Sequence, residues 1–112
     1  RALLRRPRDV ISSQLQVGDL VLDTRTRVAQ RGGRRIELSA REYALLEFLM
    51  RNKNQVLTRT QISEHVWDYD FFSESNVVDV YIRYLRVKVD EGFEPKLIQT
   101  VRGVGYKISD QA

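Results

Sequence analysis

Residues 76–88 read NVVDVYIRYLRVK, and this stretch decides the fold because its apolar residues recur at helical spacing. At about 100° per residue, the pattern predicts an amphipathic helix over about 76–89. The stripe expected to face the core consists of Val78, Ile82, Leu85 and Val89. The opposite face is neither apolar nor simply charged, and it carries Asn76, Val77, Val80, Arg83, Tyr84 and Val87.

The segment after this helix predicts a β-hairpin. Gly92 and Pro95 end the helix, and the apolar residues of 97–109 flank a turn that reads Arg102-Gly-Val-Gly105. Glycines let the backbone approach another molecule closely, and Arg102 places a cation at the tip of the hairpin.

Two capping boxes predict two helices before the amphipathic one. Ser39-Ala-Arg-Glu42 and Thr58-Arg-Thr-Gln61 each place a hydroxyl residue three positions before Glu or Gln. The first helix is apolar on most sides, which is typical of a core helix. The second is shorter and runs to about Trp67.

Residues 15–38 show short apolar alternations between turn residues, which favours three or four antiparallel strands. Gly32-Gly33 is a strong signal for a two-residue hairpin loop, because both positions accept a positive φ. Around this loop we expect Arg31, Arg34 and Arg35 to form a solvated edge that discourages strand pairing.

The composition excludes several classes of function. The chain has 112 residues with 42% hydrophobic content, enough for one domain. It has no cysteine, which excludes disulfides, thiolate zinc sites and cysteine nucleophiles, and its single histidine, His65, leaves little for metal or triad chemistry. Gly103-Val-Gly105 lacks the third glycine of a dinucleotide fingerprint. We therefore expect no enzyme, no cofactor and no metal, and the absence of a long apolar run predicts no membrane span.

The charges are unevenly distributed. The formal net charge is +4, but four of the 19 basic residues lie within the first eight positions, and the remaining residues balance. Residues 83–107 carry six cations against three acids, whereas residues 39–82 carry four against seven. A positive end is thus separated from a negative middle, which is compatible with a nucleic-acid partner at that end.

The predicted helix and hairpin together suit double-stranded DNA. A major groove about 12 Å wide admits one helix, whose outward side chains reach the base edges. Asn76 and Tyr84 can hydrogen-bond to bases, and Val77 and Val80 can contact thymine methyl groups. Phosphates would be met by Tyr81, Arg83 and Arg86, and the minor groove by Arg102. For Asp79, an interaction with the helix dipole is favoured over a contact to cytosine.

Residues 76–88 and 97–106 closely resemble the recognition helix and wing of the OmpR/PhoB family of bacterial response regulators. Leu38-Ser-Ala-Arg-Glu-Tyr-Ala-Leu-Leu46 and Val56-Leu-Thr-Arg59 resemble the starts of that family's first two helices, so the resemblance covers about 15–109. It implies an α+β fold, the winged helix-turn-helix, with an N-terminal four-stranded antiparallel sheet, three helices and a C-terminal β-hairpin wing.

The resemblance also implies roles for individual residues. Phosphate contacts are implied for Arg59, Trp67, Tyr81, Arg83, Arg86 and Tyr106. Base contacts are implied for Asn76, Val77, Val80, Tyr84, Thr100 and Arg102. Many members carry arginine at the positions of Asn76 and Tyr84, so the preferred DNA sequence cannot be copied from a relative. The family's loop toward RNA polymerase corresponds to Asp68, Tyr69, Asp70, Phe71, Phe72, Ser73, Glu74 and Ser75.

For the whole protein, the resemblance implies a phosphorelay transcription factor of the bacterial cytoplasm. Residues 1–13 are similar to a linker that follows a receiver domain, and 14–112 to the DNA-binding domain. The implied partners are direct DNA repeats bound head-to-tail, RNA polymerase, and a sensor histidine kinase acting through the receiver. The isolated domain is expected to be monomeric. One alternative function is a protein-interaction module that binds through the aromatic residues of the 68–75 loop. A hydrolase is a second alternative, which the sequence favours least.

Overall fold

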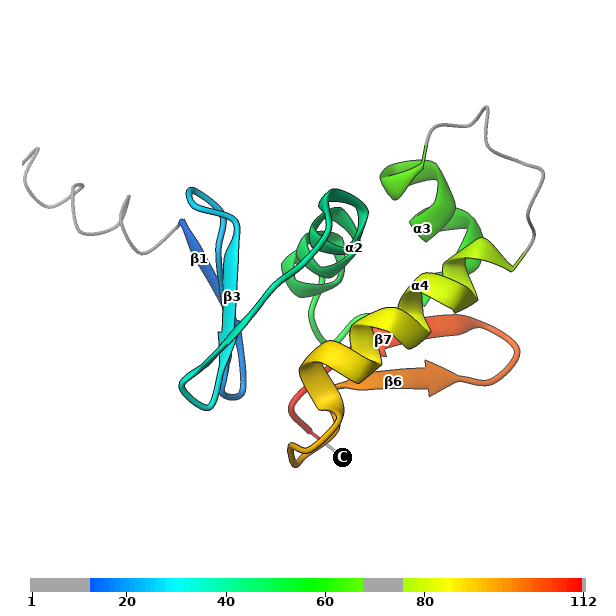
Figure 1. Ribbon diagram of the computed structural model, residues 1–112. Helices are drawn as coiled ribbons and strands as arrows, with labels where there is room; N and C mark the ends of the chain where they lie inside the picture. Colours follow the sequence, from blue (N-terminus) through cyan, green and yellow to red (C-terminus); the bar gives the residue numbers. More distant parts are fainter. Residues whose placement is uncertain (1–12, 68–75, 112) are drawn as a thin grey trace, which may run out of the picture.

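The computed structural model describes residues 13–67 and 76–111, which form two small sheets around three helices (Figure 1). The N-terminal strands are β1 (Gln14–Val17), β2 (Leu20–Asp23), β3 (Val28–Arg31) and β4 (Arg34–Ile36). The middle of the chain forms α2 (Ala40–Arg51), β5 (Leu57–Thr58) and α3 (Arg59–Val66). The rest forms α4 (Val77–Leu85), the π-helical turn η1 (Arg86–Asp90), β6 (Ile98–Val101) and β7 (Gly105–Ile108).

The first four strands form an antiparallel meander in the order β1-β2-β3-β4, which confirms the predicted N-terminal sheet. Gly32 and Gly33 have φ values of 59° and 81° and connect the paired residues Arg31 and Arg34. Both glycines therefore occupy the backbone region that a tight two-residue loop requires.

Both predicted capping boxes are confirmed. The Ser39 hydroxyl accepts from the backbone N–H of Glu42 at the start of α2, and the Glu42 carboxylate accepts from the N–H of Ser39. Thr58 and Gln61 exchange the same two bonds at the start of α3. Helix α2 contributes Leu45, Leu46 and Leu49 to the core, where all three are fully buried.

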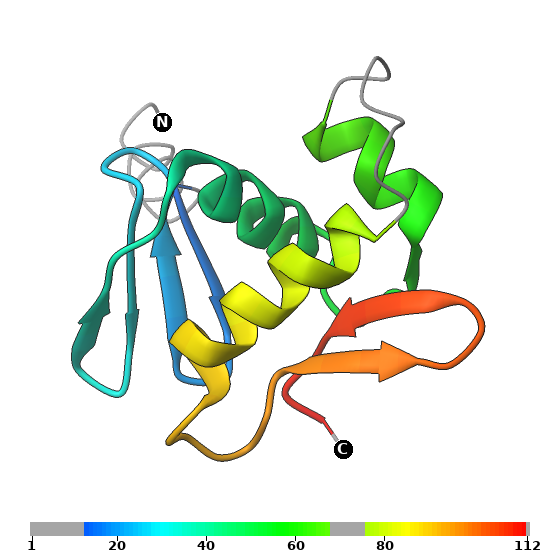
Figure 2. The same ribbon diagram turned by 45° about the vertical axis from the view of Figure 1, so that its right-hand side comes forward.

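The helix predicted over 76–89 is present, but its last turn is not α-helical. The predicted stripe of Val78, Ile82, Leu85 and Val89 is buried, as expected. From Arg86 the chain forms the wider turn η1, closed by the N–H of Glu91 donating to the carbonyl of Arg86 at 2.9 Å. Figure 2 shows α4 and η1 lying between α2 and the C-terminal hairpin.

The second sheet has the order β5-β7-β6, and its hairpin β6–β7 with the turn 102–104 is called the wing below. Gly105 pairs with Thr58 of β5 at a very close approach. A Cβ atom at Gly105 would lie 2.0 Å from the carbonyl oxygen of Leu57, so only glycine fits there. The wing is thereby joined to the residues that open α3.

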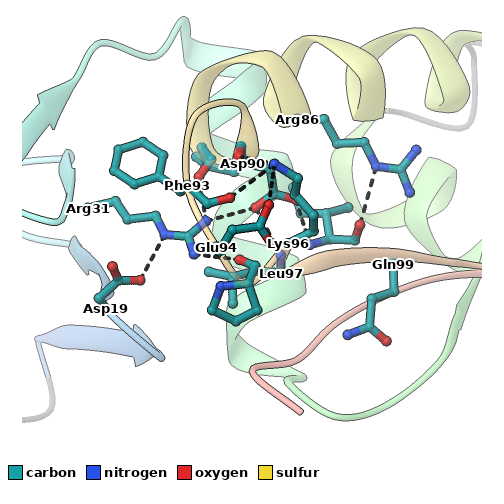
Figure 3. A network of polar contacts seen from close by, with 12 residues as sticks. Asp19, Arg31, Arg86, Asp90, Phe93, Glu94, Lys96, Leu97 and Gln99 are labelled. Atoms are coloured by element: carbon teal, nitrogen blue, oxygen red, sulfur yellow. Dashed lines mark hydrogen bonds and ion pairs between the residues drawn. The ribbon is translucent and has the colours of Figure 1, made fainter. Parts of the chain in front are cut away.

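Arg31 corrects one sequence prediction. It is fully buried instead of lying on a solvated edge, whereas Arg34 and Arg35 are exposed as predicted. Its guanidinium donates to Asp19 (2.8 Å) and to Asp90 (3.0 Å), as Figure 3 shows. The ring of Phe93 lies over it, 4.9 Å from centroid to guanidinium carbon. The N-terminal sheet is thus bonded directly to the end of η1.

Candidate nucleic-acid interface

The face of α4 opposite the buried stripe is partly open to solvent. Asn76 and Arg83 are exposed, whereas Val77 and Val80 are half-buried and Val77 packs against the edge of the core. Tyr84 is 45% exposed although it is a large aromatic residue. Side chains of mixed chemistry therefore project from a helix whose other face is fixed in the core. Such a helix can enter a groove without rearranging the fold.

The wing lies beside this helix and carries a cation at its turn. Arg102 is exposed, and no ion pair within the described residues joins it to a carboxylate. Arg86 donates to the Thr100 hydroxyl at 2.6 Å and to the carbonyl of Ile98 at 3.3 Å. Two predicted contact residues, Arg86 and Thr100, are therefore bonded to each other across the join between helix and wing.

A row of aromatic rings supports Tyr84. The rings of Trp67 and Tyr81 pack edge-on with their centroids 5.2 Å apart, and the rings of Tyr81 and Tyr84 pack edge-on at the same centroid distance. On the other side, the guanidinium of Arg41 lies 5.6 Å from the Trp67 ring centre. Trp67 is only 4% exposed, so its main role in this structure is packing. The row holds Tyr84 by packing, which limits the freedom that it must lose on binding.

Asp79 joins three elements at the N-terminal half of α4. It accepts from Arg59 Nε of α3 at 2.9 Å, and the hydroxyl of Tyr106 of β7 donates to the same oxygen. Burial alone would raise the pKa of Asp79, but these two hydrogen bonds outweigh it and hold the pKa below its ordinary value. Burial and the nearby Asp79 carboxylate raise the pKa of the Tyr106 hydroxyl. Asp79 is therefore ionised at neutral pH and holds both groups.

Sequence reasoning did not find this role of Asp79. Its place in the first turn of α4 suggested an interaction with the helix dipole, and no local motif indicates a partner 20 or 27 residues away. Tyr106 itself is only 5% exposed, so its ring belongs to the core and its hydroxyl is already bonded. Contacts of Tyr106 and Trp67 with phosphates stay predictions.

The structure therefore brings most of the predicted contact residues to one region formed by α3, α4 and the wing. The proposed polymerase loop, 68–75, lies outside the described residues. Within 13–67 and 76–111 no group of His, Cys, Asp and Glu residues could hold a metal ion. In the same part of the chain, no helix has the length and apolar character needed to cross a membrane.

Three helices packed against a strand hairpin, with an open third helix beside that hairpin, define the class of winged helix-turn-helix DNA-binding domains. The family model "Transcriptional regulatory protein, C terminal" matches residues 33–108. The chain belongs to the OmpR/PhoB family of transcriptional response regulators, and it corresponds to their DNA-binding effector domain.

Relatives and solved structures agree with this assignment. The chain is 51% identical to the transcriptional regulatory protein CusR of Escherichia coli strain K12, over 96% of this chain and 48% of CusR. It is 29% identical to the response regulator DrrB of Thermotoga maritima, an OmpR/PhoB homologue, with a TM-score of 0.78 over 96% of this chain and 51% of DrrB.

The DNA-binding domain of Klebsiella pneumoniae RstA, solved in complex with the RstA box, has a TM-score of 0.77 and 28% identity. That match covers 88% of this chain and 98% of the RstA domain. The chain spans about half the length of the curated relatives that it matches.

Proposed function

We propose that this chain binds double-stranded DNA in a sequence-specific manner and is the output domain of a two-component response regulator that controls transcription. The observation that carries the proposal is the open face of α4 beside an exposed wing arginine. In this proposal α4 enters the major groove and Arg102 reaches the adjacent minor groove, whose negative potential attracts arginine.

The proposed contacts divide into two kinds. Bases are read by the outward residues of the helix and by the wing, which are Asn76, Val77, Val80, Tyr84, Thr100 and Arg102. Phosphates are held at the edge of this surface by Arg59, Trp67, Tyr81, Arg83, Arg86 and Tyr106. Phosphate contacts position the protein and supply affinity, whereas base contacts determine which sequence is preferred.

Two substitution series test this division. Arg83→Ala removes a phosphate contact, so it should weaken binding to nearly every duplex and make the salt dependence of affinity shallower by about 0.9. Arg102→Ala should also weaken binding to nearly every duplex, because the minor groove distinguishes few sequences and attracts arginine through its negative potential. Tyr84→Ala should instead change which duplexes are selected from a random pool. Arg35→Ala, an exposed arginine on β4, is the matched control and should change neither. An unchanged preference in Tyr84→Ala would contradict the base-reading assignment.

For the whole protein, we propose head-to-tail binding to direct repeats, with phosphorylation of a receiver domain by a sensor histidine kinase raising the local concentration of two effector domains. Contact of residues 68–75 with RNA polymerase belongs to the same proposal. The family resemblance supports both, and it also supports action in the cytoplasm. A mobility-shift titration against random duplex distinguishes this function from a module that binds only proteins, because only a DNA-binding domain gives steep salt dependence.

A further inference from the structure

Asp79 places a negative charge among cations on a surface that is proposed to meet phosphates. Its side chain is 35% exposed, so part of its charge faces solvent at this surface. Arg59 is bonded to it, and Arg83 lies one helical turn further along α4. A carboxylate at this position repels a phosphate, so Asp79 favours DNA binding only if another of its contacts outweighs that repulsion.

Two contacts hold the guanidinium of Arg59 in one orientation. Arg59 Nε donates to Asp79 Oδ1 at 2.9 Å, and the guanidinium carbon lies 5.4 Å from the ring centre of Tyr106. Tyr106 in turn donates its hydroxyl to the same Asp79 oxygen, so its ring is fixed relative to that carboxylate. The carboxylate therefore sets the direction of Arg59 both directly and through Tyr106.

The bond to Asp79 leaves the part of Arg59 that suits a phosphate. A guanidinium has five N–H groups, and only the one on Nε points to Asp79. The ion pair with Asp79 uses Nε of Arg59, and the only other side chain that interacts with its guanidinium in the described ranges is Tyr106. The two terminal nitrogens form the planar fork that binds phosphate through two parallel hydrogen bonds.

We propose that Asp79 is a positioning residue for DNA binding, which holds Arg59 so that its terminal nitrogens meet a backbone phosphate beside α4. The inference rests on the proposed DNA-binding function. Arg59 is half exposed, with 45% of its side chain accessible, and a free arginine would lose rotamer freedom on contact. Asp79 removes much of that freedom before the DNA arrives. The proposal requires the gain from fixing Arg59 to exceed the repulsion between Asp79 and the phosphate, and the affinity of an Asp79 variant measures that balance.

A double-mutant cycle tests the proposal, because the charge of Asp79 should act through Arg59, whereas its bond with Tyr106 needs only an acceptor oxygen. The variants are Asp79→Asn, Arg59→Met and the double variant. Asparagine keeps an acceptor oxygen for the Tyr106 hydroxyl and removes the charge, and methionine keeps an unbranched stem. Affinity for a random-sequence duplex of about 30 base pairs is measured at several salt concentrations, since a phosphate contact needs no particular sequence. Asp110→Asn is the matched control, because this exposed carboxylate follows β7 at the end away from the wing turn.

The expected result is that Asp79→Asn weakens DNA binding in the wild-type background but not in the Arg59→Met background. In the wild-type chain, Asp79→Asn should weaken binding by about three- to tenfold and make the salt dependence shallower, as one charge-assisted contact loosens. In the Arg59→Met background, the same substitution should leave affinity unchanged or raise it, because only the repulsion is removed. Asp110→Asn should have little effect in either background.

Three results would overturn the inference. Tighter binding by Asp79→Asn in the wild-type background would mean that the carboxylate competes with phosphate for Arg59. A similar loss in both backgrounds would mean that Asp79 acts on the fold and not through Arg59. A wild-type chain without salt-dependent DNA binding would overturn the proposed function, and this inference with it, whereas the first two results leave the proposed function intact.

Discussion

Arg31→Met should destabilise this domain more than any surface substitution, because Arg31 is the only fully buried cation within the described residues and is bonded to the buried carboxylate of Asp90. Arg31 has no exposed surface, and Asp90 is 3% exposed. The guanidinium also donates to the carbonyls of Val89 (2.7 Å) and Pro95 (2.5 Å) and to Asp19. Methionine fills a similar volume but donates no hydrogen bond.

The expected loss of unfolding free energy in Arg31→Met depends on the buried groups that lose their hydrogen-bond donor. Asp90 would keep its bonds from the backbone N–H groups of Leu97 (2.9 Å) and Ile98 (3.0 Å), so its charge would not be wholly unsatisfied. Removing one partner of a buried ion pair costs about 3–5 kcal/mol, and two carbonyls also lose their donor. A domain of this size has a free energy of unfolding of about 5–15 kcal/mol, so the loss should be a large fraction of the total.

Urea unfolding followed by circular dichroism measures this cost, and Arg35→Met is the matched control. Arg35 lies on the neighbouring strand β4, its side chain is 64% exposed, and its carboxylate partner Glu37 is 3.6 Å away. That control should cost less than about 1 kcal/mol, as exposed pairs do. If Arg31→Met does not fold at all, Arg31→Lys, which keeps the charge, should give an intermediate loss. Equal midpoints for Arg31→Met and Arg35→Met would refute the reasoning.

Two further predictions concern the wing and the first helix. Gly105→Ala should cost at least about 3 kcal/mol by unfolding titration, because its Cβ would meet the Leu57 backbone, whereas Gly103→Ala meets no atom within 4 Å and should cost about 1–2 kcal/mol for its positive φ. Burial would raise the pKa of Glu42, but Lys88 Nζ at 2.6 Å and the Ser39 N–H hold it below its ordinary value of 4.5. Glu42 therefore stabilises the fold above that pH and loses its effect as pH falls through the lowered pKa. Glu42→Gln should lower the free energy of unfolding by about 1 kcal/mol at pH 7, and the difference from the wild type should become smaller below pH 4.5. A difference that does not change with pH would count against the ion pair.

Local patterns in the sequence were sufficient to predict the elements of the fold. The capping boxes at Ser39 and Thr58 each involve residues three positions apart, so their geometry depends little on the rest of the chain. The buried stripe of α4 was also predictable, since a helix places apolar residues at this spacing on one face whatever it packs against. The Gly32-Gly33 loop belongs to the same group, because a positive φ at two adjacent residues is a local requirement.

Polar contacts between distant elements were not predictable in this way. Arg31 was expected on a solvated edge because arginine near a hairpin loop is usually exposed, and its main partner Asp90 lies 59 residues further along the chain. Asp79 was assigned to the helix dipole because its place in the first turn of α4 follows from the local sequence, whereas its bond to the distant Tyr106 does not. The start of η1 at Arg86 was also missed, because no local residue pattern distinguishes a wide turn from an α-helical one.

Asp79 and Asp90 together explain how α4 and the wing are held as one unit. Asp79, near the start of α4, accepts from Tyr106 of β7, and Asp90, at the end of η1, accepts from the N–H groups that lead into β6. The segment between the two carboxylates is therefore bonded to both strands of the wing, one at each end. Since a rotation of α4 would break one of these bonds, the two carboxylates hold α4 at a fixed angle to the wing in the domain without DNA. Asp90→Asn should consequently weaken the proposed contact of Arg102 with DNA, measured as affinity for a duplex, although Asp90 itself is buried. Unchanged affinity in a folded Asp90→Asn variant would contradict this coupling.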